Sequence, residues 1–154
     1  MKTYLQNEAS ECGLASLAMV AQHYGHRIDL NAMRQRFGSS LKGARLRDLM
    51  KIAEQLSLGS RAIRLEPHRL KDITLPAILH WDLDHFVVLK EVSGNRHLVY
   101  DPARGRVIYS LAEISEHFTG VALELSPVAD FRPIVDRTRT SLSRAMLESG
   151  VWAG

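Results

Sequence analysis

The chain has 154 residues and a formal net charge of +3, with 45% hydrophobic and 24% charged residues. This length is enough for one domain with a sizeable core, and the composition is ordinary for a soluble globular protein. No apolar run approaches the roughly 18 residues that a membrane helix needs, and no signal-peptide pattern follows Met1. Because no run combines basic with aromatic residues, nucleic-acid binding is not expected.

The only cysteine, Cys12, lies where a polar segment turns into an apolar helical pattern. Ser10 is of the N-capping type, and Gly25 can end the helix in a left-handed conformation. We therefore expect Cys12 in the first helical turn, where unpaired N–H groups and the helix dipole favour a thiolate. A single cysteine forms no internal disulfide, and a reduced thiol suits the cytosol. The alternative is a small buried apolar residue with only a structural role. The predicted buried face comprises Leu14, Leu17, Ala18 and Ala21.

Two more helices are predicted before residue 60. One begins around residues 28–31 and ends at Gly38, and the other covers residues 45–58 and stops before Gly59. Packing into the core is the simplest explanation of the apolar face of the latter helix. That face is formed by Leu46, Leu49, Met50, Ala53 and Leu56.

From residue 60 the pattern changes to the alternation typical of strands. A helical turn is predicted after Pro67 and a short helix over residues 111–118. Helices followed by an antiparallel sheet predict an α+β fold. Residues 1–126 form the predicted domain, and residues 127–154, which hold two prolines and lack strand alternation, are predicted to be a linker. The predicted strands cover residues 61–65, 76–81, 85–92, 96–101, 106–109 and 121–125.

Candidate catalytic groups follow Cys12 along the chain. Cysteine hydrolases need a base beside the thiol, a group that orients the base, and an amide donor for the oxyanion. His85 opens one predicted strand and Asp101 ends the next, while Gln6 lies six residues before the thiol. Because the chain offers a candidate for each of these groups, we take a cysteine hydrolase as the hypothesis.

The predicted hairpin tests whether His85 and Asp101 can meet. A three-residue loop over residues 93–95 would place Asp101 opposite Val87, diagonal to His85 and on the same face. Asp84 would point to the other face, and Asp82 lies in the bend before the strand. The sequence therefore favours Asp101 as the orienting group, although a shift of one residue in register would reverse this result.

Three segments carry specific motifs: QNEASECGLA at residues 6–15, HWDLDHFVVL at 80–89, and DPARG at 101–105. Together they resemble the N-terminal peptidase domain of bacteriocin-exporting ABC transporters, of the colicin V and microcin type, over about residues 4–126. Those domains are papain-like cysteine peptidases that remove leaders after a double glycine. The chain therefore looks like a peptidase domain that is part of a longer exporter.

The resemblance implies that Cys12 is the nucleophile, His85 the base and acid, Asp101 the orienting group, and that Gln6 lines the oxyanion hole. It implies no metal and no cofactor, with ATP bound only in the separate nucleotide-binding domain of the exporter. His23 and His26, three residues apart, lack the companions that a metal site needs.

The implied partners are a precursor peptide with a Gly-Gly leader and the transmembrane and ATPase domains of the exporter, at the cytoplasmic side of the inner membrane. The alternative function is a domain that binds leaders without cutting them. A third possibility is an unrelated protein in which Cys12 is structural.

Double-glycine leaders are thought of as amphipathic helices, so an apolar groove beside the cleft is expected. Methionine suits varied apolar partners, and Trp81 could line the channel for the two glycines, although core packing is as good an explanation for it. We expect Ala53 and Leu56 to point inward, with Leu41 or Met50 nearer the surface. The candidate leader contacts are Leu41, Leu46, Leu49 and Met50.

Overall fold

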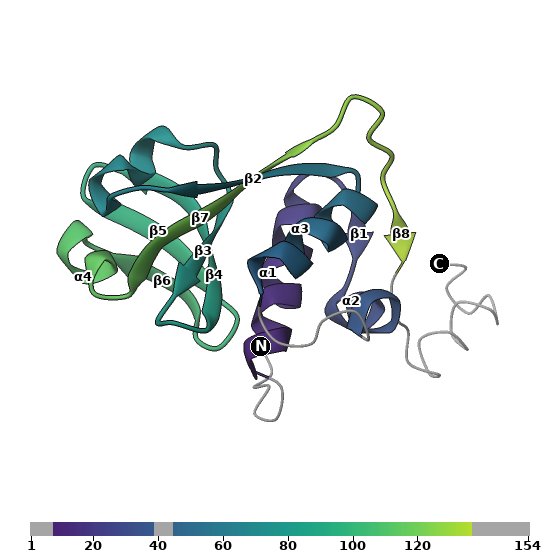
Figure 1. Cartoon of the computed structure of the whole chain (residues 1–154), viewed down its shortest axis with the longest axis horizontal. Coiled ribbons are helices and arrows are strands. Elements are labelled where there is room, and N and C mark those ends of the chain that lie inside the picture. The colour runs from purple at the N-terminus through teal and green to yellow at the C-terminus, as the bar shows by residue number, and fades with distance from the viewer. Residues whose placement is uncertain (1–7, 39–44, 137–154) are drawn as a thin grey trace, which may run out of the picture.

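The computed structural model describes residues 8–38 and 45–136. Three helices gather beside one side of a sheet, and α4 lies on its other side (Figure 1). The helical elements are α1 (Glu8–His23), α2 (Leu30–Phe37), α3 (Leu46–Gln55), the 3₁₀ helix η2 (Pro67–Asp72) and α4 (Leu111–Ser115). The strands are β1 (Arg27–Ile28), β2 (Leu58–Arg64), β3 (Ala77–Trp81), β4 (His85–Ser93), β5 (Arg96–Asp101), β6 (Gly105–Tyr109), β7 (Phe118–Pro127) and β8 (Val135–Asp136).

The first helix starts earlier than its sequence pattern predicts. It begins at Glu8, two residues before Ser10, so Cys12 is its fifth residue and lies in the second turn. The expected first-turn position is therefore wrong by one turn. The end of the helix agrees with the prediction, since Gly25 adopts a φ of 113° that favours glycine.

The boundaries of the next two helices also differ from the sequence pattern. Asp29 caps α2, and its side chain accepts a hydrogen bond from the Ala32 N–H at 2.8 Å. The two residues before it form β1, a strand too short to give an alternating pattern. The third helix ends at Gln55, where the left-handed Ser57 (φ 60°) turns the chain into β2.

The main sheet has six strands in the order β2-β7-β3-β4-β5-β6, and every neighbouring pair is antiparallel. The predicted α+β architecture is therefore confirmed. Alternate residues of the central strands face opposite layers. Ile78, Phe86 and Leu123 join the core under α1–α3, whereas Leu79, Val87 and Ala122 join the core under η2 and α4.

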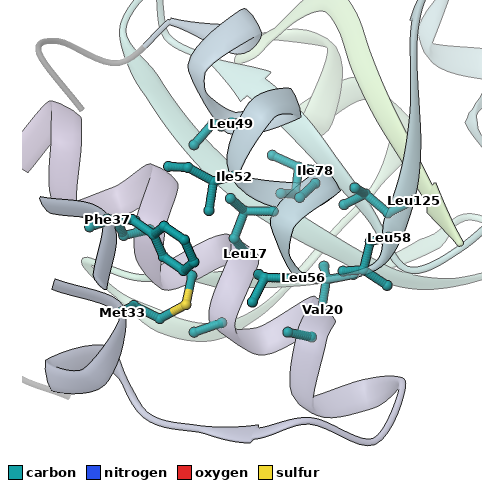
Figure 2. Close-up of a cluster of buried hydrophobic side chains, with 14 of the residues drawn as sticks. Leu17, Val20, Met33, Phe37, Leu49, Ile52, Leu56, Leu58, Ile78 and Leu125 are labelled. Atoms are coloured by element: carbon teal, nitrogen blue, oxygen red, sulfur yellow. The ribbon is translucent and has the colours of Figure 1, made fainter. Parts of the chain in front are cut away.

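The core between the sheet and the helices holds the largest cluster of buried side chains. Figure 2 shows Leu17 and Val20 of α1 packed among side chains of α3 and the strands. Ala53 and Leu56 are fully buried there, which confirms the expected inward face of the third helix. Because α1 is anchored along its length, its cysteine is held against the sheet.

The chain beyond β7 returns to the helices. Its strand β8 pairs in parallel with β1, and the Arg27 N–H donates to the Ile134 carbonyl at 2.7 Å. The predicted boundary after residue 126 falls inside β7, and packed chain extends to Asp136. Residues 137–154 of the predicted linker lie outside the described residues. Among residues 8–38 and 45–136, no helix is long and apolar enough to cross a membrane.

Candidate active site

Two side chains of α1 hold the residue that follows His85. The Phe86 N–H donates to Cys12 Sγ at 3.3 Å, and Ser16 Oγ donates to the Phe86 carbonyl at 3.3 Å. Cys12 is only 3% exposed, and Ser16 is fully buried. Both backbone polar groups of one residue of β4 are thus hydrogen-bonded to consecutive turns of the helix. This arrangement fixes the sulfur beside the start of β4, where His85 lies.

A glycine beside the cysteine lets a second helix approach. A Cβ atom at Gly13 would lie 2.9 Å from Leu49 Cδ2, closer than real Cβ atoms come to other atoms. Leu49 is fully buried, so α3 packs directly against α1 at the turn that carries Cys12. The apolar face of α3 is therefore a neighbour of the candidate site.

His85 and Asp101 meet at the ends of adjacent strands. His85 Nε2 and Asp101 Oδ1 are 2.7 Å apart, and the same oxygen accepts the Ala103 N–H at 2.8 Å. The Asp101 side chain is 4% exposed and that of His85 is 20% exposed. Because Nε2 faces the carboxylate, Nδ1 is the ring nitrogen left for the sulfur of Cys12.

The predicted register is correct at the site but not at the turn. Val88 pairs with Tyr100 as predicted, yet Ser93 pairs with Arg96, so the loop has two residues rather than three. A bulge between Leu89 and Glu91 absorbs the difference. The predicted contact between His85 and Asp101 is present because the bulge restores the parity that the shorter turn would have reversed.

Asp82 does not compete for His85. Its Oδ1 lies 2.8 Å from Nδ1 of His117, the residue immediately before β7. Asp82 also adopts a φ of 48° in the turn between β3 and β4. Asp82 and Asp101 thus contact different histidines, in line with the preference for Asp101 that was predicted from the sequence.

Electrostatics favour an imidazolium at His85. Burial alone would lower the pKa of His85, but the hydrogen bond to Asp101 and the neighbouring Cys12 sulfur raise the pKa to about 10. Burial would raise the pKa of Asp101, but the hydrogen bonds from His85 and the Ala103 N–H lower it below its usual range. At neutral pH the site therefore holds a carboxylate and a protonated imidazole within reach of the Cys12 sulfur, the set of groups that a cysteine hydrolase uses.

Comparison with known proteins agrees with this geometry. Residues 1–130 match the Peptidase C39 family. The chain belongs to the peptidase C39 family. The family and the cysteine peptidase predicted from the sequence motifs are thereby confirmed.

Individual relatives point the same way. The chain is 47% identical over 144 residues to the colicin V secretion/processing ATP-binding protein of Escherichia coli, covering 94% of this chain and 20% of that protein. It is 32% identical over 142 residues to the lactococcin-G-processing and transport ATP-binding protein of Lactococcus lactis subsp. lactis, covering 88% of this chain and 20% of that protein. The chain therefore spans about a fifth of the length of these curated relatives.

Solved structures confirm the papain-like peptidase fold. A double glycine motif protease from an AMS/PCAT transporter, solved in complex with the leader peptide, matches with a TM-score of 0.71 and 37% identity, over 82% of this chain and 91% of that one. The peptidase domain of Streptococcus ComA matches with a TM-score of 0.68 and 26% identity, over 80% and 96% of the two chains.

Two of the residues predicted for this C39 site, Gln6 and Leu41, lie outside the described residues. Leu46 and Met50 are half-buried at the edge of the core. Leu49 and Trp81 are 0% and 2% exposed, so they fill the core and present no surface to a peptide. Of the leader contacts predicted on α3, only Leu46 and Met50 therefore have exposed surface among the described residues.

The two histidines near the end of α1 have other partners. His26 is buried, with Nε2 2.6 Å from the Leu56 carbonyl and Nδ1 accepting the Ile134 N–H at 2.8 Å. His23 Nδ1 lies 2.9 Å from Lys90 Nζ, and burial followed by the Lys90 charge lowers the pKa of His23. In the part of the chain that the structure describes, no group of three or more metal-ligating side chains comes together.

The structure adds features that the sequence reasoning missed. Ser16 stands one turn after Cys12, and this i, i+4 spacing was the available signal for its role beside the thiol. A groove of about 290 Å³ also runs between α1, β4 and β5. Its apolar and polar lining could not be found by periodicity, because it joins residues far apart in sequence: Met19, Gln22, His23, Pro76, Val88, Lys90 and Tyr100.

Proposed function

We propose that this chain is the peptidase domain of an exporter of bacteriocin- or microcin-type peptides and that it cleaves their leaders after a Gly-Gly motif. The observation that carries the proposal is the arrangement of Cys12, His85 and Asp101, with a 2.7 Å contact between the last two. Relatives whose names describe secretion and processing, and a related protease bound to a leader peptide, support it.

In the proposed mechanism, the proton of Cys12 already resides on His85 as an ion pair of thiolate and imidazolium, and the sulfur attacks the carbonyl carbon of the second glycine. A C–S bond forms, and the amide of Gln6 is proposed to donate to the oxyanion. The imidazolium then gives its proton to the departing amine as the C–N bond breaks. Water hydrolyses the thioester with His85 as base, which releases the leader with a terminal carboxylate. These steps use only side chains of the chain and the water that enters.

Asp101 acts in this scheme by holding the base. Its Oδ1 is fixed by the Ala103 N–H and accepts from Nε2 of His85, so the ring presents Nδ1 to the sulfur. Because Asp101 is almost fully buried, water does not compete for this hydrogen bond. The proposed exporter would present the site on the cytoplasmic side of the inner membrane, where a thiol stays reduced.

Leader recognition is proposed to involve the exposed edge of α3. The close contact between Gly13 and Leu49 brings this helix to the turn of α1 that carries Cys12. Leu46 and Met50 lie half-buried on the same helix and can pack against an apolar face of a leader helix. The groove between α1 and β4 is the competing location.

The alternative is a domain that binds a leader without cleaving it. The raised pKa of His85 and the hydrogen bond from Phe86 to the sulfur favour cleavage, since binding alone requires neither. The two functions differ in one measurable outcome, the appearance of a free leader.

The test is incubation of the purified chain with a synthetic precursor that carries a Gly-Gly leader, followed by mass spectrometry. We expect one cut after the second glycine by the wild type, and no cut by Cys12→Ala, which should bind the leader with unchanged affinity. Binding by the wild type without a cut would support the alternative. Cleavage by Cys12→Ala would refute the mechanism.

Leader docking has a test of its own. Met50→Glu should raise KM for a full leader about five- to twentyfold, because a helix-in-groove contact depends on a few apolar anchors. Its kcat/KM on a short Gly-Gly peptide should not change. The matched variant Met19→Glu, in the groove beside α1, should affect neither substrate. If Met19→Glu raised KM for the full leader and Met50→Glu did not, the leader would bind in the groove beside α1. Equal losses on both substrates would mean damage to the fold.

A further inference from the structure

A second histidine–aspartate pair lies next to the site. His117 Nδ1 and Asp82 Oδ1 are 2.8 Å apart, and the Asp82 N–H donates to the His117 carbonyl at 2.9 Å. Asp82 is thus tied through its side chain and its backbone to one residue that immediately precedes β7. These two contacts, one through the side chain and one through the backbone, fix both the position and the direction of the chain at Asp82.

The same histidine also holds the residue before Asp82. Its ring stacks on the Trp81 indole, with centroids 5.0 Å apart and planes 7° from parallel. Trp81 is 2% exposed and is the partner of His85 in the register of β3 and β4. His117 is therefore connected to His85 through one stacked ring and one strand pair.

The turn between Trp81 and His85 needs such support. Asp82 and Leu83 adopt φ values of 48° and 82°, in the left-handed region that residues other than glycine rarely occupy. Each residue of this kind costs on the order of 1 kcal/mol and persists where its surroundings hold it. Leu83 is 84% exposed, so its side chain adds little packing to hold the turn. The ties to His117 supply the restraint.

We propose that His117 is a positioning residue for the catalytic histidine: through Asp82 and Trp81 it fixes the β3–β4 turn and hence the place where His85 enters β4. The inference rests on the proposed function for the role of His85. His85 must face Asp101 and Cys12 at once, and Phe86, the next residue, already holds the sulfur. A small displacement of the turn therefore changes the distance between His85 and Cys12 while leaving leader contacts on α3 in place.

The test compares three variants of this turn. Asp82→Ala should lower kcat about 5- to 30-fold with KM within about twofold, because small misplacements of a catalytic group act on the chemical step. Asp82→Asn keeps an oxygen acceptor and tolerates a positive φ, so it should restore kcat to within about threefold of the wild type. The matched control is Asp84→Ala, an exposed acidic residue of the same turn, which should not change kcat.

A second readout needs no substrate. The rate of alkylation of Cys12 by iodoacetamide, measured from pH 4 to 10, reports how well the His85 imidazolium is placed against the sulfur. Asp82→Ala should shift this profile to higher pH, and Asp82→Asn should not. An unchanged profile, or a loss of kcat matched by an equal rise in KM, would overturn the inference. A wild type that is alkylated as expected but cleaves no leader would instead count against the proposed function alone.

Discussion

The two histidine–aspartate pairs have nearly the same contact distance and very different surroundings. Nitrogen and oxygen are 2.7 Å apart between His85 and Asp101, and 2.8 Å apart between His117 and Asp82. The Asp101 side chain is 4% exposed, whereas that of Asp82 is 50% exposed. The imidazole of the first pair also neighbours the Cys12 sulfur, whereas one face of the His117 imidazole is stacked on the Trp81 indole.

This difference teaches that the hydrogen bond alone does not make a catalytic pair. Water competes for the exposed carboxylate of Asp82, so that pair contributes little beyond geometry. Burial opposes the charged form of Asp101, but the hydrogen bonds from His85 and the Ala103 N–H outweigh it and keep the carboxylate charged. That carboxylate and the Cys12 sulfur in turn raise the pKa of His85 to about 10. One pair therefore provides chemistry and the other provides position.

Removing each imidazole gives the largest contrast between the pairs. His85→Ala should lower kcat/KM at least ~10³-fold, because both proton transfers lose their carrier. His117→Ala should lower it about 5- to 30-fold, since it only loosens the turn. Initial rates on a fluorogenic Gly-Gly peptide check both values. Similar losses in the two variants would mean that the second pair takes part in the chemistry.

Changing each carboxylate to an amide gives the next contrast. Asp101→Asn should lower kcat about tenfold, and Asp101→Ala about 10²-fold, because the amide oxygen still accepts from Nε2 while alanine leaves the imidazole unheld. The amide also lacks the negative charge, so the alkaline limb of the pH–rate profile should move to lower pH. Asp82→Asn is the control and should keep the alkaline limb in place. If Asp82→Asn were the more damaging change, the orienting group would be misassigned.

Much of this arrangement follows from the sequence. The helices-then-strands order predicted the α+β fold, and the bounds predicted for β5 are those of the structure. The predicted position of Cys12 was wrong by one turn. Ser10 is of the capping type and suggested that the helix begins there, but the helix begins two residues earlier, at Glu8. Local signals of this kind define which elements exist better than where they begin.

The contact between His85 and Asp101 shows why the rest of the site could not be predicted from the sequence. Parity correctly placed Asp101 beside His85, but only because the two-residue turn is offset by a bulge near Lys90. The bulge has no glycine or proline to announce it, and either change alone would have reversed the result. The tie between His117 and Asp82 spans 35 residues and depends on how β3 and β7 lie side by side, which no local pattern encodes.

A change of stability with pH provides a smaller contrast. The folded-state pKa of His85 is raised from 6.5 to about 10. The contribution of His85 to the free energy of unfolding is therefore complete below pH 6.5 and is lost as pH rises toward 10. The lowered pKa of Asp101 acts at the other end, with stability lost as pH falls below the usual carboxyl range. In urea unfolding, the free energy of unfolding of the wild type should fall by ~1–2 kcal/mol relative to that of His85→Gln between pH 6 and 10. A constant difference between the two proteins would contradict the raised pKa.

The smallest expected effect concerns a charge near the buried carboxylate. Arg104 is exposed and lies close enough to Asp101 for its charge to contribute to the lowered pKa of that residue. Arg104→Gln should therefore raise the Asp101 pKa slightly, as measured by NMR titration of its carboxyl carbon, with kcat at pH 7 changed less than about twofold. Because exposed charges are screened, the wild type and the variant should converge at about 1 M salt. Arg106→Gln, an exposed neighbour on β6, should leave the titration unchanged. If the difference survived high salt, Arg104 would act on Asp101 through a fixed contact, and the carboxylate would owe its charge to more than the hydrogen bonds from His85 and the Ala103 N–H.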